Sequence, residues 1–168
     1  MSKKKDWWYL KPQPKIYEGK HMLDKRVELN VELIEKFVDA GVPRKQVFVT
    51  GHSCGGLTTL LFMSRYPDKA GGGISYMQAC FGKLSHKYKV KKNGVEKAMA
   101  KFRKKAQGPH DLRQKMNDEI KNNLKVPILA FTHPKDRYEG LLSDWLEEIP
   151  GIKRIVISKD YKINGKSC

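Results

Sequence analysis

Residues 47–56 read Val-Phe-Val-Thr-Gly-His-Ser-Cys-Gly-Gly, and this stretch decides the fold. Its first four residues are mostly β-branched or aromatic, which predicts a buried strand. The segment that follows, Leu57 to Arg65, has the apolar spacing of an amphipathic helix. Between the strand and the helix lies the pattern G-x-S-x-G, in which Ser53 stands between Gly51 and Gly55. Because glycine has no Cβ, the two glycines permit a sharp turn that holds Ser53 in a strained conformation with its hydroxyl exposed.

A helix that begins at this turn points its first N–H groups and the positive end of its dipole toward the serine. An oxyanion formed when the Ser53 hydroxyl attacks a carbonyl carbon would be stabilised there. The pattern G-x-S-x-G alone also occurs by chance in loops, so its setting matters. The strand before it and the helix after it are the context that the chemistry requires.

The stretch resembles the nucleophile elbow of the α/β-hydrolases. Gly56 and the run Arg65-Tyr66-Pro67-Asp68 are most similar to the dienelactone-hydrolase and prolyl-oligopeptidase-like branches of that superfamily. The resemblance implies that Ser53 is a nucleophile. It also implies that the backbone N–H of Cys54, the residue after the nucleophile, is one donor of the oxyanion hole.

The bulk properties indicate a single globular domain over residues 1–168, with 39% hydrophobic residues available for a core. No run of about 18 apolar residues is present, so we expect no membrane span. The basic residues near Met1 have no apolar segment of signal-peptide length behind them, which favours a cytoplasmic protein.

The formal net charge is +16, and most of the excess lies between Phe81 and Lys125. Such a field attracts nucleic acid or other anions. The basic residues are mainly lysines, however, which decorate many surfaces that bind no nucleic acid. A lysine-rich solvated surface is therefore the favoured interpretation. Nucleic-acid binding through the segment from Lys83 to Lys125 is the alternative.

The three cysteines, Cys54, Cys80 and Cys168, form no C-x-x-C pair and predict neither a zinc site nor a disulfide framework. We expect no metal or organic cofactor. Cys80 and Cys168 each follow a predicted strand and could meet at one end of a parallel sheet. A disulfide between these two is left open.

Helices and strands alternate along the rest of the chain, which predicts an α/β fold with a mostly parallel sheet flanked by helices. The resemblance identifies this as part of an α/β-hydrolase fold. The predicted helices span Asp24–Ala40 and Tyr138–Ile149, and the predicted strands span Gly71–Met77, Val126–Thr132 and Ile155–Ile157.

Residues 81–125 form a basic helical insertion in this scheme. Two helices are predicted, Val95–Ala106 and Leu112–Leu124, with Gly108-Pro109 as the break between them. In the family, insertions at this place often form a lid over the active site. The alternative is an ordinary crossover with a charged outer face.

Asp136 is the candidate acid of a catalytic triad. It lies in the loop after the strand that begins Val126-Pro127, where the α/β-hydrolases carry the carboxylate that orients the histidine. The alternative is that Pro134-Lys135-Asp136 is merely a turn rich in turn-forming residues.

None of the five histidines follows Asp136, although the family's chain order is serine, acid, histidine. The family's histidine is expected in the loop after Ile157. His52 and His133 are weak internal substitutes. At most one strand, Trp7–Leu10, precedes the first helix, so the chain is expected to be shorter at both ends than its relatives. An unpaired sheet edge would then favour self-association.

The favoured hypothesis is a serine hydrolase that acts on carboxylic esters, lactones or peptides through an acyl-enzyme. Without an identified base, the chain is expected to hydrolyse model esters poorly. The alternatives are a basic nucleic-acid-binding protein and a catalytically inactive hydrolase-like fragment.

Overall fold

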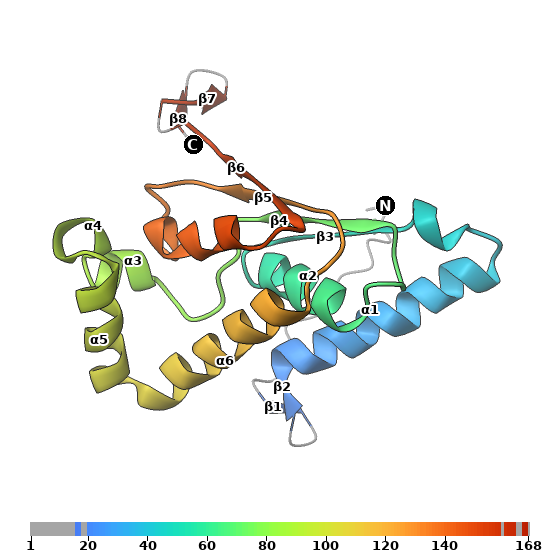
Figure 1. The fold of residues 1–168 in the computed structure, drawn as a ribbon, viewed down its shortest axis with the longest axis horizontal. Helices are drawn as coiled ribbons and strands as arrows, with labels where there is room; N and C mark the ends of the chain where they lie inside the picture. Colours follow the sequence, from blue (N-terminus) through green and yellow to red (C-terminus); the bar gives the residue numbers. More distant parts are fainter. Residues whose placement is uncertain (1–15, 18–19, 159, 164–165, 168) are drawn as a thin grey trace, which may run out of the picture.

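The computed structural model describes residues 16–17, 20–158, 160–163 and 166–167. Its centre is a parallel sheet with the strand order β3-β4-β5-β6 (Figure 1). The four strands are β3 (Phe48–His52), β4 (Gly72–Tyr76), β5 (Ile128–Thr132) and β6 (Ile152–Val156). Parallel neighbours require a crossover connection between each pair of strands, so the predicted alternation of strands and helices is confirmed.

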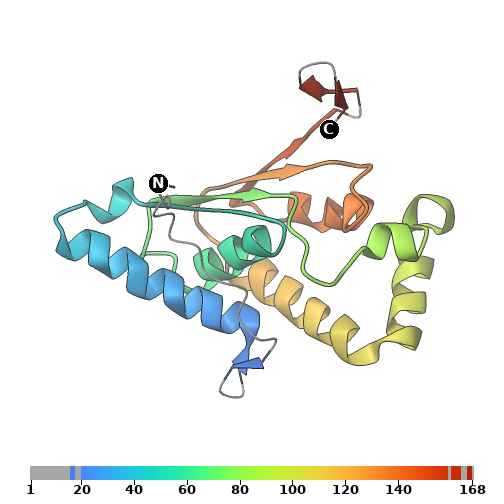
Figure 2. The same ribbon diagram turned by 180° about the vertical axis from the view of Figure 1, so that it is seen from behind.

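The three long helices lie together on one face of the sheet (Figures 1 and 2). They are α1 (Met22–Asp39), α2 (Cys54–Arg65) and α6 (Gln107–Asn123). Helix α2 is buried almost all round, because it lies against the sheet and also contacts α1 and α6. At its end, Arg65 donates hydrogen bonds to Asp24 of α1 at 2.7 Å and to Glu119 of α6 at 2.5 Å. This ion-pair network joins the three helices at their polar rim.

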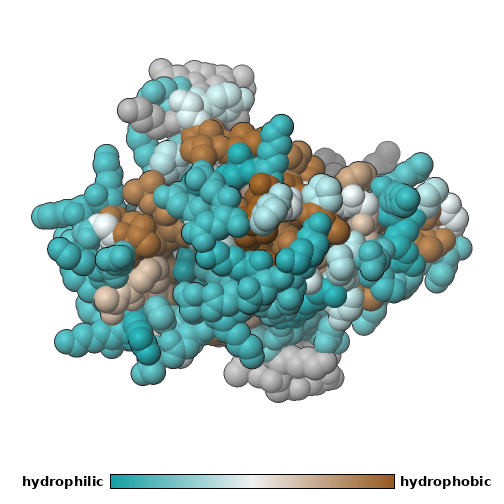
Figure 3. Space-filling model, in the orientation of Figure 1, coloured by the Kyte–Doolittle hydropathy of each residue, from teal (hydrophilic) through white to brown (hydrophobic). Residues whose placement is uncertain are grey.

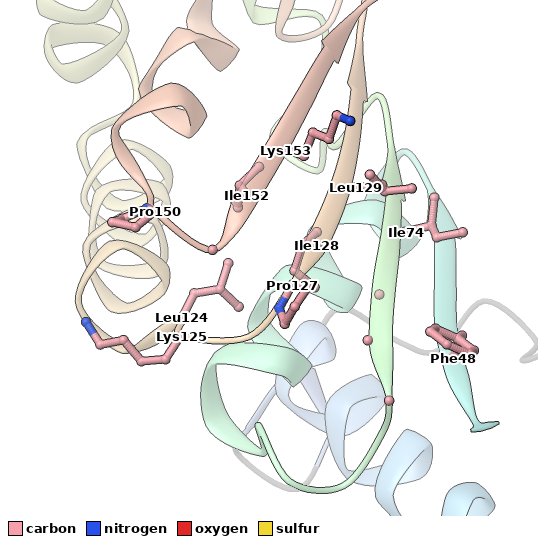
Figure 4. Close-up of a pocket in the computed structure, with 14 residues that line it drawn as sticks. Phe48, Ile74, Leu124, Lys125, Pro127, Ile128, Leu129, Pro150, Ile152 and Lys153 are labelled. Carbon is pink, nitrogen blue, oxygen red and sulfur yellow. The ribbon is translucent and has the colours of Figure 1, made fainter. Parts of the chain in front are cut away.

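The opposite face of the sheet carries no helix in the described part of the chain. Apolar side chains gather there (Figure 3), and 61% of the surface of Phe48 is exposed. A groove of about 680 Å³ lies partly on this face, where Phe48, Ile74 and Leu129 contribute to its wall (Figure 4). No described strand pairs with the outer edge of β3. Within the described residues, the sheet therefore presents both an apolar face and an unpaired edge.

The connection from β4 to β5 is helical, as predicted, but its break is elsewhere. It contains α3 (Leu84–Lys87), α4 (Val90–Asn93), α5 (Val95–Lys105) and α6. The predicted break at Gly108-Pro109 is wrong, since both residues lie in the first turn of α6 and the chain bends at Ala106. Proline is tolerated in a first turn because its missing N–H would have no partner there.

The segment predicted as a helix over Tyr138–Ile149 is instead the 3-10 helix η2 (Gly140–Glu148). The carbonyl of Leu142 accepts a hydrogen bond from the Arg113 guanidinium at 3.3 Å. The Leu142 carbonyl thus has a partner outside its own segment.

The remaining elements are short. They are β1 (Ile16–Tyr17), β2 (Lys20–His21), the 3-10 helix η1 (Arg44–Gln46), β7 (Lys162–Ile163) and β8 (Lys166–Ser167). The predicted strand Trp7–Leu10 lies outside the described residues. Of the helices that are described, none combines the length and apolar character that a membrane crossing requires.

Candidate active site

Ser53 lies at the end of β3, directly before the first residue of α2. Its backbone has φ 56° and ψ −121°, a region that residues with a Cβ rarely adopt. Such a conformation costs about 1–3 kcal/mol and persists only where the surroundings enforce it. Here the Ser53 N–H donates to the carbonyl of Tyr76 at 2.9 Å, and the Ser53 carbonyl accepts from Leu57 and Ala79. The predicted strained turn is confirmed.

The two glycines of the motif are not equivalent. A Cβ on Gly51 would overlap the carbonyl group of Gly55 and lie 2.9 Å from its Cα. A Cβ on Gly55 would meet nothing within 4 Å, so the expectation that both glycines are needed for space is wrong at Gly55. Gly56 is the second tight position, because its Cβ would lie 2.9 Å from the carbonyl oxygen of Tyr76. Space around the turn at Ser53 is tight because β3 and β4 both approach the first turn of α2.

The side chain of Ser53 does not cap the helix that follows it. A serine at an N-cap usually accepts a hydrogen bond from an N–H of the first turn. Ser53 makes no such bond, and its Oγ donates instead to the carbonyl of Ala79 at 3.2 Å. The first N–H groups of α2, including that of Cys54, have no partner within the helix. A positive dipole end therefore adjoins a half-buried hydroxyl.

Cys54 is bonded to Cys80, which overturns the alternative of a bridge between Cys80 and Cys168. The two Cα atoms lie 4.5 Å apart, although the residues are separated by 26 positions. The reason is that the loop after β4 returns beside the first turn of α2, where Ala79 bonds Ser53. Cys168 lies outside the described residues.

Asp136 lies in the loop after β5. Because β3 and β5 run parallel, this loop leaves the sheet at the end where Ser53 lies. Its carboxylate accepts backbone hydrogen bonds from Tyr138 at 3.2 Å and from Glu139 at 3.0 Å. These bonds order the entry to η2, as the turn alternative implies. An ionised carboxylate has further lone pairs, so they leave capacity to orient a histidine.

The two internal histidines are placed differently. His52, at the end of β3, is exposed. His133 is buried, and its Nδ1 accepts a hydrogen bond from the Lys135 N–H at 3.0 Å. Its Nε2 is buried without a hydrogen-bond partner. Among the described side chains, none of the histidines is hydrogen-bonded to Ser53 or Asp136.

A buried ion pair beside the acid loop was not anticipated from the sequence. Arg113 of α6 donates to Glu139 at 2.5 Å, and both side chains are less than a tenth exposed. Burial raises the pKa of Glu139, and the guanidinium of Arg113 opposes that rise. The pair joins the helical connection to the segment that Asp136 orders. The available sequence signal was a charged residue beside Leu112 on the apolar stripe of α6.

No protein-family model and no curated protein matches the sequence. Solved structures do match. The monoacylglycerol lipase of Paleococcus ferrophilus aligns with a TM-score of 0.52 at 16% identity, over 80% of this chain and 65% of that one. A thermophilic esterase aligns with a TM-score of 0.46 at 17% identity, over 80% of this chain and 63% of the esterase. An α/β-hydrolase from the sediment metagenome of the Mar Chica lagoon, Morocco, aligns with a TM-score of 0.47 at 16% identity, over 79% of this chain and 59% of that enzyme.

The chain thus has the α/β-hydrolase fold in part. It spans about two thirds of the length of the lipase that it matches. The parallel order β3-β4-β5-β6 and the strained serine after β3 agree with this assignment.

Proposed function

We propose that the chain carries the catalytic core of a serine hydrolase, with Ser53 as the nucleophile. The observation that supports this most is the conformation of Ser53 itself. It has a positive φ at the N-cap of α2, yet its hydroxyl is withheld from capping. A purely structural N-cap serine would bond the first turn. A strained serine whose hydroxyl does not cap the adjacent helix is typical of a nucleophile.

The reaction follows from this geometry. A base removes the Ser53 hydroxyl proton while Oγ attacks the carbonyl carbon of a carboxylic ester, a lactone or a peptide. The oxyanion is stabilised by the Cys54 N–H and the positive end of α2. The leaving group departs, and water then releases the acid from the acyl-enzyme. Asp136 orients the imidazole and stabilises its protonated form. The resemblance of the residues around Ser53 to the dienelactone-hydrolase and prolyl-oligopeptidase-like branches supports this choice of substrates.

The described residues supply no base to Ser53, so the test supplies one. The 168-residue chain is treated with a fluorophosphonate in the presence and absence of imidazole, and modification of Ser53 is followed by mass spectrometry. Because Ser53 is a weak nucleophile without a base, labelling should be slow alone and accelerate with imidazole. The Ser53→Ala variant should not label at all.

The role of Asp136 is tested by comparison with a matched control. Asp136→Asn should lose most of the acceleration by imidazole, while Asp68→Asn, beyond the end of α2, should keep it. If Ser53 is not modified with or without imidazole in a folded chain, the chain is an inactive hydrolase-like protein. If the acceleration survives Asp136→Asn, Asp136 serves only the turn before η2.

A further inference from the structure

The bridge between Cys54 and Cys80 joins the start of α2, directly after the candidate nucleophile, to the loop that follows β4. Cys54 follows Ser53 directly, and Cys80 follows Ala79. Ala79 bonds Ser53 twice. Its N–H donates to the Ser53 carbonyl at 3.1 Å, and its carbonyl accepts from Ser53 Oγ at 3.2 Å. The disulfide therefore closes a small ring of covalent and hydrogen bonds around the serine.

We propose that Cys54 and Cys80 form a thiol–disulfide exchange site that sets how tightly residues 77–81 are held against Ser53. The partner in this exchange is a dithiol reductant. Both cysteines are half-buried, so a small thiol can reach the bridge. The effect on hydrolysis rests on the proposed function, whereas the exchange and the release of the loop do not.

The order of bond breaking follows from the position of Cys54. It is the first residue of α2, a helix of twelve residues whose positive dipole end stabilises negative charge on the Cys54 sulfur. A better-stabilised thiolate is the better leaving group. The reductant's thiolate therefore attacks Sγ of Cys80, and Cys54 leaves as the thiolate. The second thiol of the reductant then displaces Cys80. Two electrons and two protons pass to the cysteine pair, and the reductant becomes a disulfide.

After reduction, only hydrogen bonds and packing hold the loop. Besides the two bonds of Ala79, the Met77 N–H donates to the carbonyl of Phe131 at 2.9 Å. Met77 has φ 45°, a left-handed conformation that a side chain disfavours. Gln78 is buried with neither its amide oxygen nor its nitrogen hydrogen-bonded. The strained backbone of Met77 and the unpaired amide of Gln78 disfavour the held position, so the loop should open once the covalent bond is removed. Opening also frees the Ser53 hydroxyl from the Ala79 carbonyl.

Peptide mapping of the full chain, prepared without reductant, should recover Cys54 and Cys80 in one linked peptide. Hydrogen exchange at the amides of residues 77–81 should become about tenfold faster, or more, when dithiothreitol is added. Cys80→Ser should show the fast exchange without reductant. Cys168→Ser, the matched control, should behave as the unaltered chain. Glutathione should form its mixed disulfide at Cys80.

Two results would overturn the exchange site: free thiols at both cysteines in the unreduced chain, or equal exchange at residues 77–81 with and without dithiothreitol. A mixed disulfide found at Cys54 would refute the assigned leaving group. Fluorophosphonate labelling with imidazole should be several-fold faster after reduction. If the loop opens on reduction but Ser53 never labels, the exchange site stands and the proposed hydrolase activity fails.

Discussion

Replacing each glycine of the motif with alanine separates the geometry of the turn from helix propensity. In Gly51→Ala, the new methyl group overlaps the carbonyl of Gly55, which is backbone and cannot rotate away. Either the start of α2 must move away from β3, or Ser53 must leave its conformation. In Gly55→Ala, the methyl group meets nothing within 4 Å and lies within α2.

The two substitutions should therefore differ in sign. Overpacking against rigid surroundings typically costs about 1–3 kcal/mol, and the backbone overlap at Gly51 places this case at about 3 kcal/mol or more. Alanine in a helix is favoured over glycine by about 0.5–1 kcal/mol, so Gly55→Ala should be neutral or stabilising. For a chain of this size, each kcal/mol shifts Tm by about 2–4 °C. Gly51→Ala should lower Tm by about 6–12 °C, and Gly55→Ala should raise it slightly.

Urea unfolding monitored by circular dichroism gives the free energy of unfolding of each variant, and calorimetry gives Tm. Imidazole-assisted labelling of Ser53 should also fall in Gly51→Ala, because the serine is displaced. The reasoning is refuted if Gly51→Ala unfolds within about 0.5 kcal/mol of the unaltered chain, the range of an ordinary surface substitution. Equal losses in the two variants would also refute it, since only Gly51 meets backbone.

Arg113→Met should lower the free energy of unfolding by about 3–5 kcal/mol, because it leaves the buried carboxylate of Glu139 unpaired. Urea unfolding measures this loss, and a clearly smaller loss would contradict the importance of the ion pair. The carboxyl of Glu35, hydrogen-bonded chiefly by Arg44, has its pKa lowered from 4.5 to about 2, so the stability it contributes is present above pH 4.5 and is lost as the pH falls toward 2. Arg44→Met should move the NMR titration of Glu35 upward, and an unchanged midpoint would show that the ion pair does not form in solution. If the free edge of β3 and the apolar face mediate self-association, Phe48→Lys should reduce it in sedimentation velocity more than Phe37→Lys on α1, which is also exposed.

The sequence by itself determined the local turn at Ser53 and the order of strands and helices. Both depend on neighbours in the chain: β-branched residues before the turn, glycines within it, and apolar residues at helical spacing after it. The sequence also predicted that Asp136 lies at the same end of the sheet as Ser53, because the loops that follow parallel strands leave the sheet at one end. Helix ends were less predictable, since Pro109 is tolerated within the first turn of α6.

Only the tertiary structure decided which groups surround Ser53. Cys80 forms a disulfide with Cys54, and the Ala79 carbonyl accepts a hydrogen bond from the Ser53 hydroxyl. Both contacts form because the loop after β4 folds back over the start of α2. Arg113 meets Glu139 across a separation of 26 residues for a similar reason. No local pattern encodes such contacts. They arise where the packing of α2 and α6 against the sheet brings distant loops together, and burial then requires the polar groups to find partners.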